Sequence, residues 1–150
     1  NSVYKSIFPT FSLQKLWISF CGLPPGFFCF LPKFGFLCSS SKKHFFLVSL
    51  DAEKKLDTKA LRAQLQSSSL SFASEELLFE KLHLERGAVS PLAIPGDLSG
   101  EITVVLDDDF KEEELLSFHP GTNTASVFLT FADLLRYLQS FPNPLLRLVL

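Results

Sequence analysis

The chain has 150 residues, of which 47% are hydrophobic and 20% charged, and its formal net charge is −2. This composition predicts one globular domain with a substantial core and argues against a disordered chain. The three cysteines lie between Cys21 and Cys38. They give no even disulfide framework, and no histidine is spaced from them as in a zinc site, which favours a reducing compartment.

Charge is distributed unevenly along the chain. Residues 1–62 carry nine Lys/Arg against three Asp/Glu, a balance of +6, whereas residues 63–150 carry five against thirteen, a balance of −8. These numbers argue against a wide nucleic-acid-binding face, but a small contact with one end of a nucleic acid through the first half remains open. An ordinary solvated surface with uneven charge explains the same pattern.

Residues 1–32 are rich in phenylalanine, lack acidic residues and are interrupted by Pro24-Pro25-Gly26. The uncharged run from Leu16 to Leu31 is shorter than the ~20 residues that a spanning helix needs, and the Pro-Pro-Gly lies in its middle. No small-residue cleavage site follows, as a secretory signal requires. We predict an atypical N-terminal segment, residues 1–32, packed on a domain over 33–150. A membrane-tethered domain is the alternative.

The middle of the chain alternates between strand and helix patterns. Two β-rich stretches, Phe34 to Leu37 and Phe45 to Leu50, are separated by a polar turn and predict a hairpin. After it we predict a helix over 59–66 capped by Asp57 or Thr58, a short strand around 70–72, and a helix that is capped by Ser74 and ends at Gly87.

The second half continues this alternation. We predict strands over 101–106, 115–118, 126–130 and 146–150, and a helix over 131–139 capped by Thr130. The run Asp107-Asp108-Asp109 suggests a metal site, but consecutive side chains cannot all converge on one ion, so a solvated turn is predicted. The irregular order of elements predicts an α+β domain with a mixed, curved sheet.

The segment Gly87-Ala88-Val89-Ser90-Pro91 is a candidate binding loop. Its glycine permits positive φ, its proline fixes φ, and the small residues between them leave main-chain N–H groups uncovered. Such groups suit a carbonyl or carboxylate oxygen. A helix end followed by a stop signal gives the same pattern.

A second polar turn, Phe118 to Ala125, contains an imidazole, an amide and hydroxyls between two predicted strands, where they can face a cleft. The alternative is that Asn123 and Thr124 satisfy the turn and that His119 is simply exposed.

With these motifs, residues 33–150 resemble the prolyl-tRNA-synthetase-associated editing domains, the YbaK-type family of trans-acting aminoacyl-tRNA deacylases. The family's K-x-x-x-L motif is similar to Lys33 to Leu37, its G-x-x-x-P loop to Gly87 to Pro91, and its FHP-x-x-N-T-A turn to Phe118 to Ala125. Residues 70–74 and 134–138 are also similar. The V-S-P in the loop resembles the branch that clears alanine from proline tRNA.

The chain departs from the family pattern in two places. Phe34 stands where members usually have asparagine, and residues 1–32 do not resemble the helix, strand and helix that precede the lysine in the family. These departures leave open whether part of the cleft wall is rebuilt and whether activity is retained.

The resemblance implies a barrel-like sheet flanked by helices and a metal-independent ester hydrolase without a cofactor. It implies hydrolysis of alanyl-tRNA(Pro) by a free-standing cytoplasmic proofreading factor. The implied catalytic residues are Lys33, Gly87 and His119, and the implied substrate-binding residues are Ala88, Val89, Ser90, Pro91, Asn123 and Thr124. The implied partner is the acceptor end of tRNA(Pro). Whether prolyl-tRNA synthetase is a second partner is left open. Neither DNA nor a membrane is an expected partner. The alternatives are a cysteinyl-tRNA(Pro) deacylase and an inactive module that binds tRNA or a synthetase.

Overall fold

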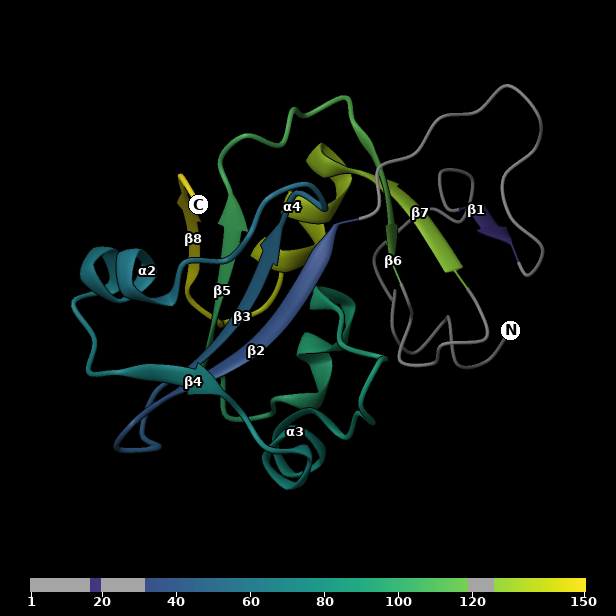
Figure 1. Ribbon diagram of the computed structural model, residues 1–150. Helices are drawn as coiled ribbons and strands as arrows, with labels where there is room; N and C mark the ends of the chain where they lie inside the picture. Colours follow the sequence, from purple (N-terminus) through teal and green to yellow (C-terminus); the bar gives the residue numbers. More distant parts are fainter. Residues whose placement is uncertain (1–16, 20–31, 119–125) are drawn as a thin grey trace.

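Two β-sheets organise the computed structural model, which describes residues 17–19, 32–118 and 126–150 (Figure 1). The larger sheet has the strand order β4-β2-β3-β5-β8 and the smaller has the order β1-β7-β6. The strands are β1 Trp17–Ser19, β2 Lys33–Ser39, β3 Phe45–Leu50, β4 Leu70–Phe72, β5 Ile102–Asp107, β6 Leu115–Phe118, β7 Ser126–Thr130 and β8 Leu145–Leu148. The helices are α2 Thr58–Leu65, α3 Glu75–Leu82 and α4 Phe131–Gln139, with a 3-10 helix, η2 Pro91–Gly96.

The larger sheet is mixed, as predicted. Strand β2 pairs antiparallel with β3 and β4, which confirms the hairpin, whereas β3 with β5 and β5 with β8 are parallel. The barrel-like closure was wrong, because the sheet is open, with β4 and β8 at its two edges. Helices cover both faces. Strand β4 has three residues that pair with β2 only at Leu37 to Ser39, and no described strand joins β4 to β8.

The helix starts were predicted from their capping residues. Asp57 accepts hydrogen bonds from two main-chain N–H groups of α2, and Ser74 and Thr130 each accept one from α3 and α4. The predicted end of α3 at Gly87 was wrong. The helix ends at Leu82, because His83 takes a left-handed conformation (φ 55°) and donates its N–H to the Phe79 carbonyl.

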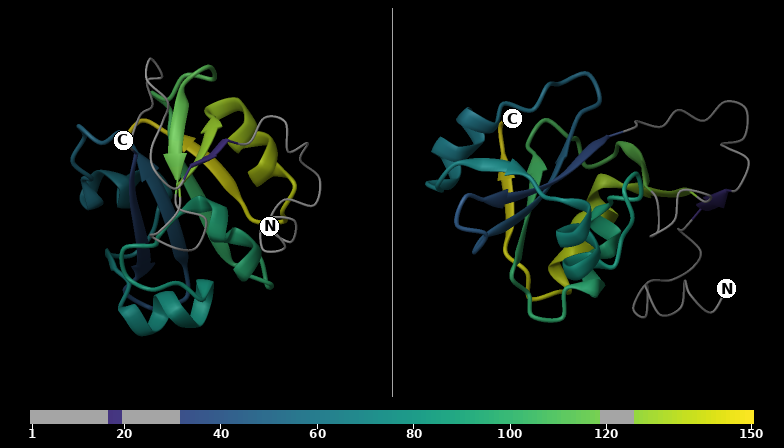
Figure 2. Two further views of the ribbon diagram at one scale, coloured as in Figure 1. Left: turned by 90° about the vertical axis from the view of Figure 1, so that its right-hand side faces the viewer. Right: turned by 60° about the horizontal axis from the view of Figure 1, so that its bottom comes forward.

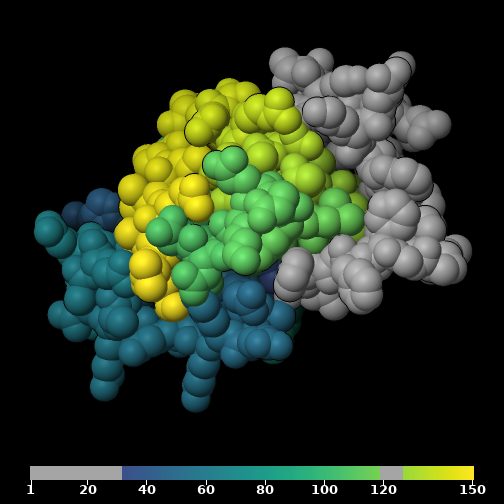
Figure 3. Space-filling view, turned by 90° about the horizontal axis from the view of Figure 1, so that it is seen from above, coloured from purple at the N-terminus to yellow at the C-terminus, as the bar shows by residue number. Residues whose placement is uncertain are grey.

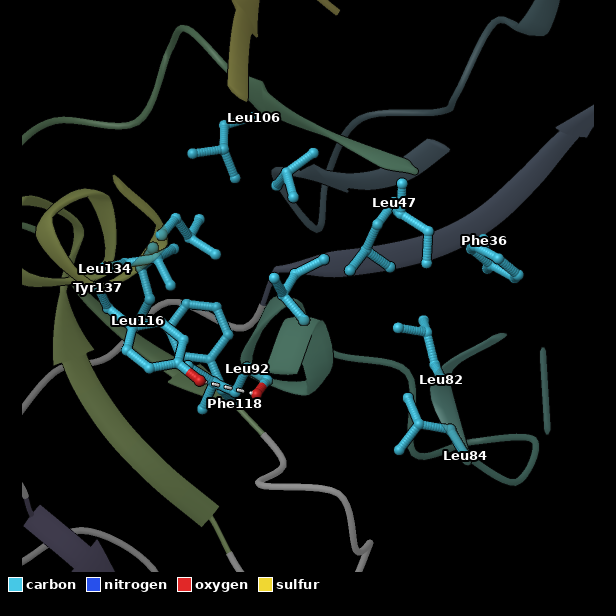
Figure 4. Close-up of a cluster of buried hydrophobic side chains, with 14 of the residues drawn as sticks. Phe36, Leu47, Leu82, Leu84, Leu92, Leu106, Leu116, Phe118, Leu134 and Tyr137 are labelled. Carbon is cyan, nitrogen blue, oxygen red and sulfur yellow. Dashed lines mark hydrogen bonds between the residues drawn. The ribbon is translucent and has the colours of Figure 1, made fainter. Parts of the chain in front are cut away.

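Each face of the larger sheet packs against different elements (Figures 1 and 2). On one face, Leu37, Val48 and Val105 pack with Leu61 of α2. On the other, Phe36, Leu47 and other residues join a larger core with α3, η2, α4 and the smaller sheet (Figure 4). Because side chains alternate along a strand, even-numbered residues of β2 face the larger core and odd-numbered ones face α2.

Two buried carboxylates tie distant segments together. Asp97, directly after η2, accepts hydrogen bonds from the Ile102 N–H (2.9 Å) and from the Asn143 side-chain amide (2.8 Å). Asp107 is completely buried and paired with Lys54 at 2.9 Å. The solvated turn predicted for Asp107 to Asp109 was therefore wrong at its first residue, because an ammonium group from a distant loop neutralises that carboxylate.

The turn after β5 lies beside the C-terminal strand on the surface seen from above (Figure 3). The Asp108 N–H donates to the Leu148 carbonyl at 2.8 Å, and Arg147 pairs with Asp108 at 3.2 Å. These contacts fix β8 at the end of the sheet.

Candidate functional site

A cavity of about 740 Å³ lies between β2, the start of α3 and the turn at Gly87. It extends around the sheet edge: Phe34, Phe36 and Leu78 line it from the larger-core side, whereas Phe72, which is opposite Leu37 in β2, lines it from the α2 side. The complete lining is Pro32, Phe34, Gly35, Phe36, Phe72, Ala73, Ser74, Glu75, Leu78, Arg86, Gly87, Val89 and Ser117.

Gly87 holds the cavity wall in a conformation that other residues avoid. It is exposed and has φ +89°, and a Cβ atom built on it would meet nothing within 4 Å. Glycine is therefore needed at this position for its backbone conformation and not to leave room for a neighbour. The turn is closed by the Ala88 N–H, which donates to the Glu85 carbonyl at 3.1 Å.

The other end of this segment is buried and fixed. The Ser90 hydroxyl accepts a hydrogen bond from the Leu92 N–H at 3.2 Å, and Pro91 occupies the first turn of η2. The Tyr137 hydroxyl of α4 donates to the Leu92 carbonyl at 3.0 Å (Figure 4). Burial raises the pKa of Tyr137, so the hydroxyl keeps its proton and remains a donor.

Two main-chain N–H groups of the segment have no acceptor among the described residues. Within the part of the chain that the structure describes, no residue accepts a hydrogen bond from the N–H of Gly87 or Val89, and both residues line the cavity. Two N–H donors on one turn can bind a carbonyl oxygen or an oxyanion when both point toward it.

The opposite wall is an unpaired stretch of strand edge. The Phe36 carbonyl accepts from the Ala73 N–H at 2.8 Å, so the main chain of Phe36 faces away from β3. The main chain of Phe34 faces the same way, because this direction repeats every two residues. Strand β4 pairs only as far as Leu37, and among the described residues none bonds the N–H or carbonyl of Phe34 on that side. The cavity thus has main-chain hydrogen-bonding groups on both walls.

A charged pair stands at the cavity rim. Arg86 and Glu75 approach to 3.5 Å, and their side chains are 86% and 68% exposed. Such an exposed pair contributes little to stability, so either group can exchange its partner for a ligand at small cost.

Lys33, predicted as a catalytic residue, lies elsewhere in this structure. Its ammonium donates to the Lys54 carbonyl at 3.0 Å, and Lys33 is not among the residues that line the cavity. Because side chains alternate along β2, the Lys33 side chain lies on the same face as that of Leu37, which packs on the α2 side. The structure therefore brings Gly87 and Val89 to the cavity without Lys33.

The remaining predicted residues fall into two groups. Ala88, Ser90 and Pro91 are buried behind the cavity wall, in the same segment as Gly87 and Val89. The others, His119, Asn123 and Thr124, lie outside the described residues. On the strand before them, Ser117 lines the cavity, and the ring of Phe118 is 5.7 Å from that of Phe34.

Sequence reasoning missed Phe34, Gly35, Phe72 and Arg86 as lining residues. Two signals were available. Phe34 and Gly35 belong to the lysine motif, and Phe72 stands two residues before the helix cap Ser74. Arg86 directly precedes Gly87, so the turn that presents the glycine also presents this side chain.

Residues 17–19, 32–118 and 126–150 contain no group of three or more His, Cys, Asp or Glu side chains placed to hold a metal ion. In the same ranges, no helix has both the length and the apolar character to cross a membrane.

Comparisons with known proteins agree on one family. Residues 35–137 match the family described as the aminoacyl-tRNA editing domain. The chain is 35% identical over 108 residues to the prolyl-tRNA editing protein ProX of Acetoanaerobium sticklandii, covering 72% of this chain and 66% of that protein. It is 37% identical over 100 residues to prolyl-tRNA synthetase associated domain-containing protein 1 of Danio rerio, covering 65% of this chain and 54% of the relative. The chain thus spans less than two thirds of the length of either relative.

The fold has a counterpart among solved structures. A crystal structure described as a candidate trans-editing enzyme for prolyl tRNA synthetase superposes with a TM-score of 0.70 at 16% identity, covering 96% of this chain and 92% of that one. At this level of identity the likeness concerns the fold alone.

Proposed function

This chain belongs to the aminoacyl-tRNA editing domain family, and we propose that it hydrolyses the aminoacyl ester of mischarged tRNA(Pro) as a trans-acting editing factor. The observation that carries the proposal is the cavity lined by Gly87 and Val89, whose N–H groups have no acceptor among the described residues. The names of the relatives, which refer to prolyl-tRNA editing and to prolyl-tRNA synthetase, support tRNA(Pro) as the carrier.

Hydrolysis of an aminoacyl ester needs few catalytic side chains. An aminoacyl ester is already activated, so water attacks its carbonyl carbon, the bond to the ribose oxygen breaks, and that oxygen takes a proton as the amino acid leaves. The main need is to position water and to stabilise the oxyanion. The N–H groups of Gly87 and Val89 would bind the oxyanion, and the neighbouring ribose hydroxyl would orient the water.

Alanyl-tRNA(Pro) is the substrate that we propose, with cysteinyl-tRNA(Pro) as the alternative. A synthetase pocket built for proline excludes smaller amino acids poorly, because a missing methylene is worth only about 1–3 kcal/mol. A second site that accepts small side chains and excludes proline by size corrects this error. The half-buried Val89 side chain lines the cavity and is the proposed size filter.

Binding of the tRNA end would use groups outside the cavity wall. Lys33 is exposed, and its ammonium holds only a main-chain carbonyl among the described residues. It could exchange that carbonyl for a terminal phosphate, to which a compact ammonium is well suited. We also propose that His119, Asn123 and Thr124 contact the substrate.

The test is deacylation of alanyl-tRNA(Pro) by the purified protein, with prolyl-tRNA(Pro) as the substrate to be spared. For Lys33→Ala we expect KM to rise by about 5- to 10-fold with kcat nearly unchanged, because the proposed contact is a phosphate contact outside the reacting centre. Lys43→Ala, an exposed lysine of the β2–β3 turn, is the matched control. If the protein binds tRNA without hydrolysing the ester, the inactive binding module is the better explanation. The presence of Phe34 in place of asparagine also favours that alternative.

A further inference from the structure

Phe72 is a largely exposed aromatic residue at the mouth of the cavity. Its side chain is 65% exposed although it lies on a strand of the larger sheet, and it lines the cavity together with Gly87 and Val89. Single exposed apolar residues are common on protein surfaces. The position of this ring is unusual, because it is held in place and leaves most of its surface to solvent.

Gly35 provides the place where the ring lies. A Cβ atom added at Gly35 would approach the Phe72 Cε1 atom to 3.1 Å, which is tighter than ordinary contact. The ring therefore packs directly on the main chain of β2, at the part of the strand edge that lines the cavity. A side chain at position 35 would push the ring away from the strand.

One cationic residue lines the same cavity as the ring, and another lies on the same face of β2 as Gly35. Arg86 lines the same cavity and is 86% exposed. Lys33 stands two residues before Gly35 on β2, and therefore on the same side of the strand. An exposed aromatic surface with cationic residues on neighbouring segments has the chemistry that recognises a nucleotide: the ring stacks on a base and a cation pairs with phosphate.

We propose that Phe72 is the stacking platform for the terminal base of the tRNA acceptor end, and that Gly35 is required to seat its ring. The proposal rests on the proposed function, because the base and the ester belong to the same terminal nucleotide. With the ester carbonyl at the N–H groups of Gly87 and Val89, the base of that nucleotide extends to another part of the same cavity, where Phe72 supplies an apolar face.

Binding of RNA hairpins tests this assignment without requiring hydrolysis. The probes are two uncharged acceptor-stem hairpins of tRNA(Pro), one ending in adenosine and one with an abasic ribose in its place, and Kd is measured by fluorescence anisotropy. We expect wild type to bind the adenosine-ended hairpin roughly 5- to 100-fold more tightly, the range that stacking of one base supports. Phe72→Ala should bind both hairpins equally, and Phe72→Tyr should keep the preference.

Two further variants separate stacking from general damage. Phe79→Ala removes another exposed phenylalanine (59%) that does not line this cavity, and it should keep the preference for adenosine. Gly35→Ala should reduce the preference, because the exposed ring can move away without unfolding the sheet. Circular dichroism melting checks that each variant is folded.

The outcomes are distinguishable from failure of the proposed function. Loss of the preference in Phe72→Ala alone supports the assignment even if the protein hydrolyses no ester. The same preference in wild type and Phe72→Ala, or no preference in wild type, overturns it. A change only in which amino acid is removed, with the base preference intact, also overturns it and would place Phe72 in the amino-acid pocket.

Discussion

The two faces of the larger sheet use polar groups in opposite ways. On the α2 face, Lys54 and Asp107 pair with each other and hold the structure together. On the cavity face, main-chain groups of Phe34, Gly87 and Val89 are left without partners among the described residues. The comparison separates a buried ion pair that stabilises the fold on the α2 face from main-chain groups on the cavity face that are available to the proposed ligand chemistry.

The largest expected effect is on the α2 face. Lys54→Met leaves the buried Asp107 carboxylate without its cation, and we expect roughly 3 kcal/mol of destabilisation, near the lower limit for a buried pair because Lys54 partly reaches solvent. Urea unfolding at pH 7 measures the loss. Lys55→Met, on the exposed neighbouring residue, is the control and should change little.

The same variant has a signature in pH. Burial lowers the pKa of Lys54, but its hydrogen bonds to Asp109 and Asp107 and the attraction of both carboxylates outweigh this and raise the pKa above 10.5. The pair therefore stabilises the protein fully below pH 10.5 and less as the pH rises through the folded-state pKa. In Lys54→Met, the free energy of unfolding should therefore fall less steeply with pH in this alkaline range than in wild type. An unchanged alkaline slope would mean that the pair does not stabilise the fold.

On the cavity face, a backbone change should affect activity more than stability. Gly87→Ala places a side chain at φ +89°, which disfavours the present turn by roughly 1–2 kcal/mol and displaces the N–H groups. We expect deacylation to fall about 10- to 100-fold, somewhat less than on deletion of an oxyanion donor.

The control for this variant is Gly100→Ala. Gly100 also has positive φ (69°) but does not line the cavity. Gly100→Ala should lose at least as much stability, because its added Cβ atom would also approach the Pro142 Cγ to 3.3 Å, and it should keep its kcat. Equal losses of kcat in the two glycine variants would show that strain alone, and not the position of the cavity donors, explains the effect.

Tyr137→Phe tests the support behind the cavity wall. The change removes the hydrogen bond to the buried Leu92 carbonyl, and we expect about 1–2 kcal/mol of destabilisation with a smaller fall in kcat. Chemical unfolding and single-turnover deacylation measure the two effects. Ser140→Ala removes a hydroxyl from the end of the same helix without touching η2, and it should leave kcat unchanged.

The smallest effect concerns selectivity. Val89→Ala enlarges the cavity and should reduce the preference for alanyl- over prolyl-tRNA(Pro) by roughly 10-fold, since a methylene-sized difference is worth about 1–3 kcal/mol. The ratio of kcat/KM for the two substrates measures it, and Val89→Ile should shift the ratio in the opposite direction. An identical ratio in all three proteins would rule out Val89 as the size filter.

Local signals explain what the sequence predicted well. The caps Asp57, Ser74 and Thr130 are followed by helices in the structure, because a cap acts on N–H groups two or three residues away. The cavity turn around Gly87 was found for the same reason, since its requirements are conformational and lie within five residues.

Features set by distant contacts were missed. Which side of β2 would form the cavity depends on where α3 and the Gly87 turn pack, so the sequence could not show that Phe34, and not Lys33 on the opposite face, would line it. The burial of Asp107 depends on Lys54, which is 53 residues away. The seat of Phe72 on Gly35 depends on the pairing of β4 with β2. The assignment of residues 1–32 and 33–150 to a segment and a domain stays a prediction.

The bond between Asp97 and Asn143 has a consequence for biosynthesis. Asp97 directly follows η2, and Asn143 lies 46 residues further along the chain. The Asn143 side-chain amide donates to both the Asp97 carboxylate and the Ile102 carbonyl. During translation, Asp97 and Ile102 cannot form these hydrogen bonds until Asn143 has left the ribosome. A nascent chain that ends just before Asn143 therefore carries every lining residue of the cavity and still lacks this bond.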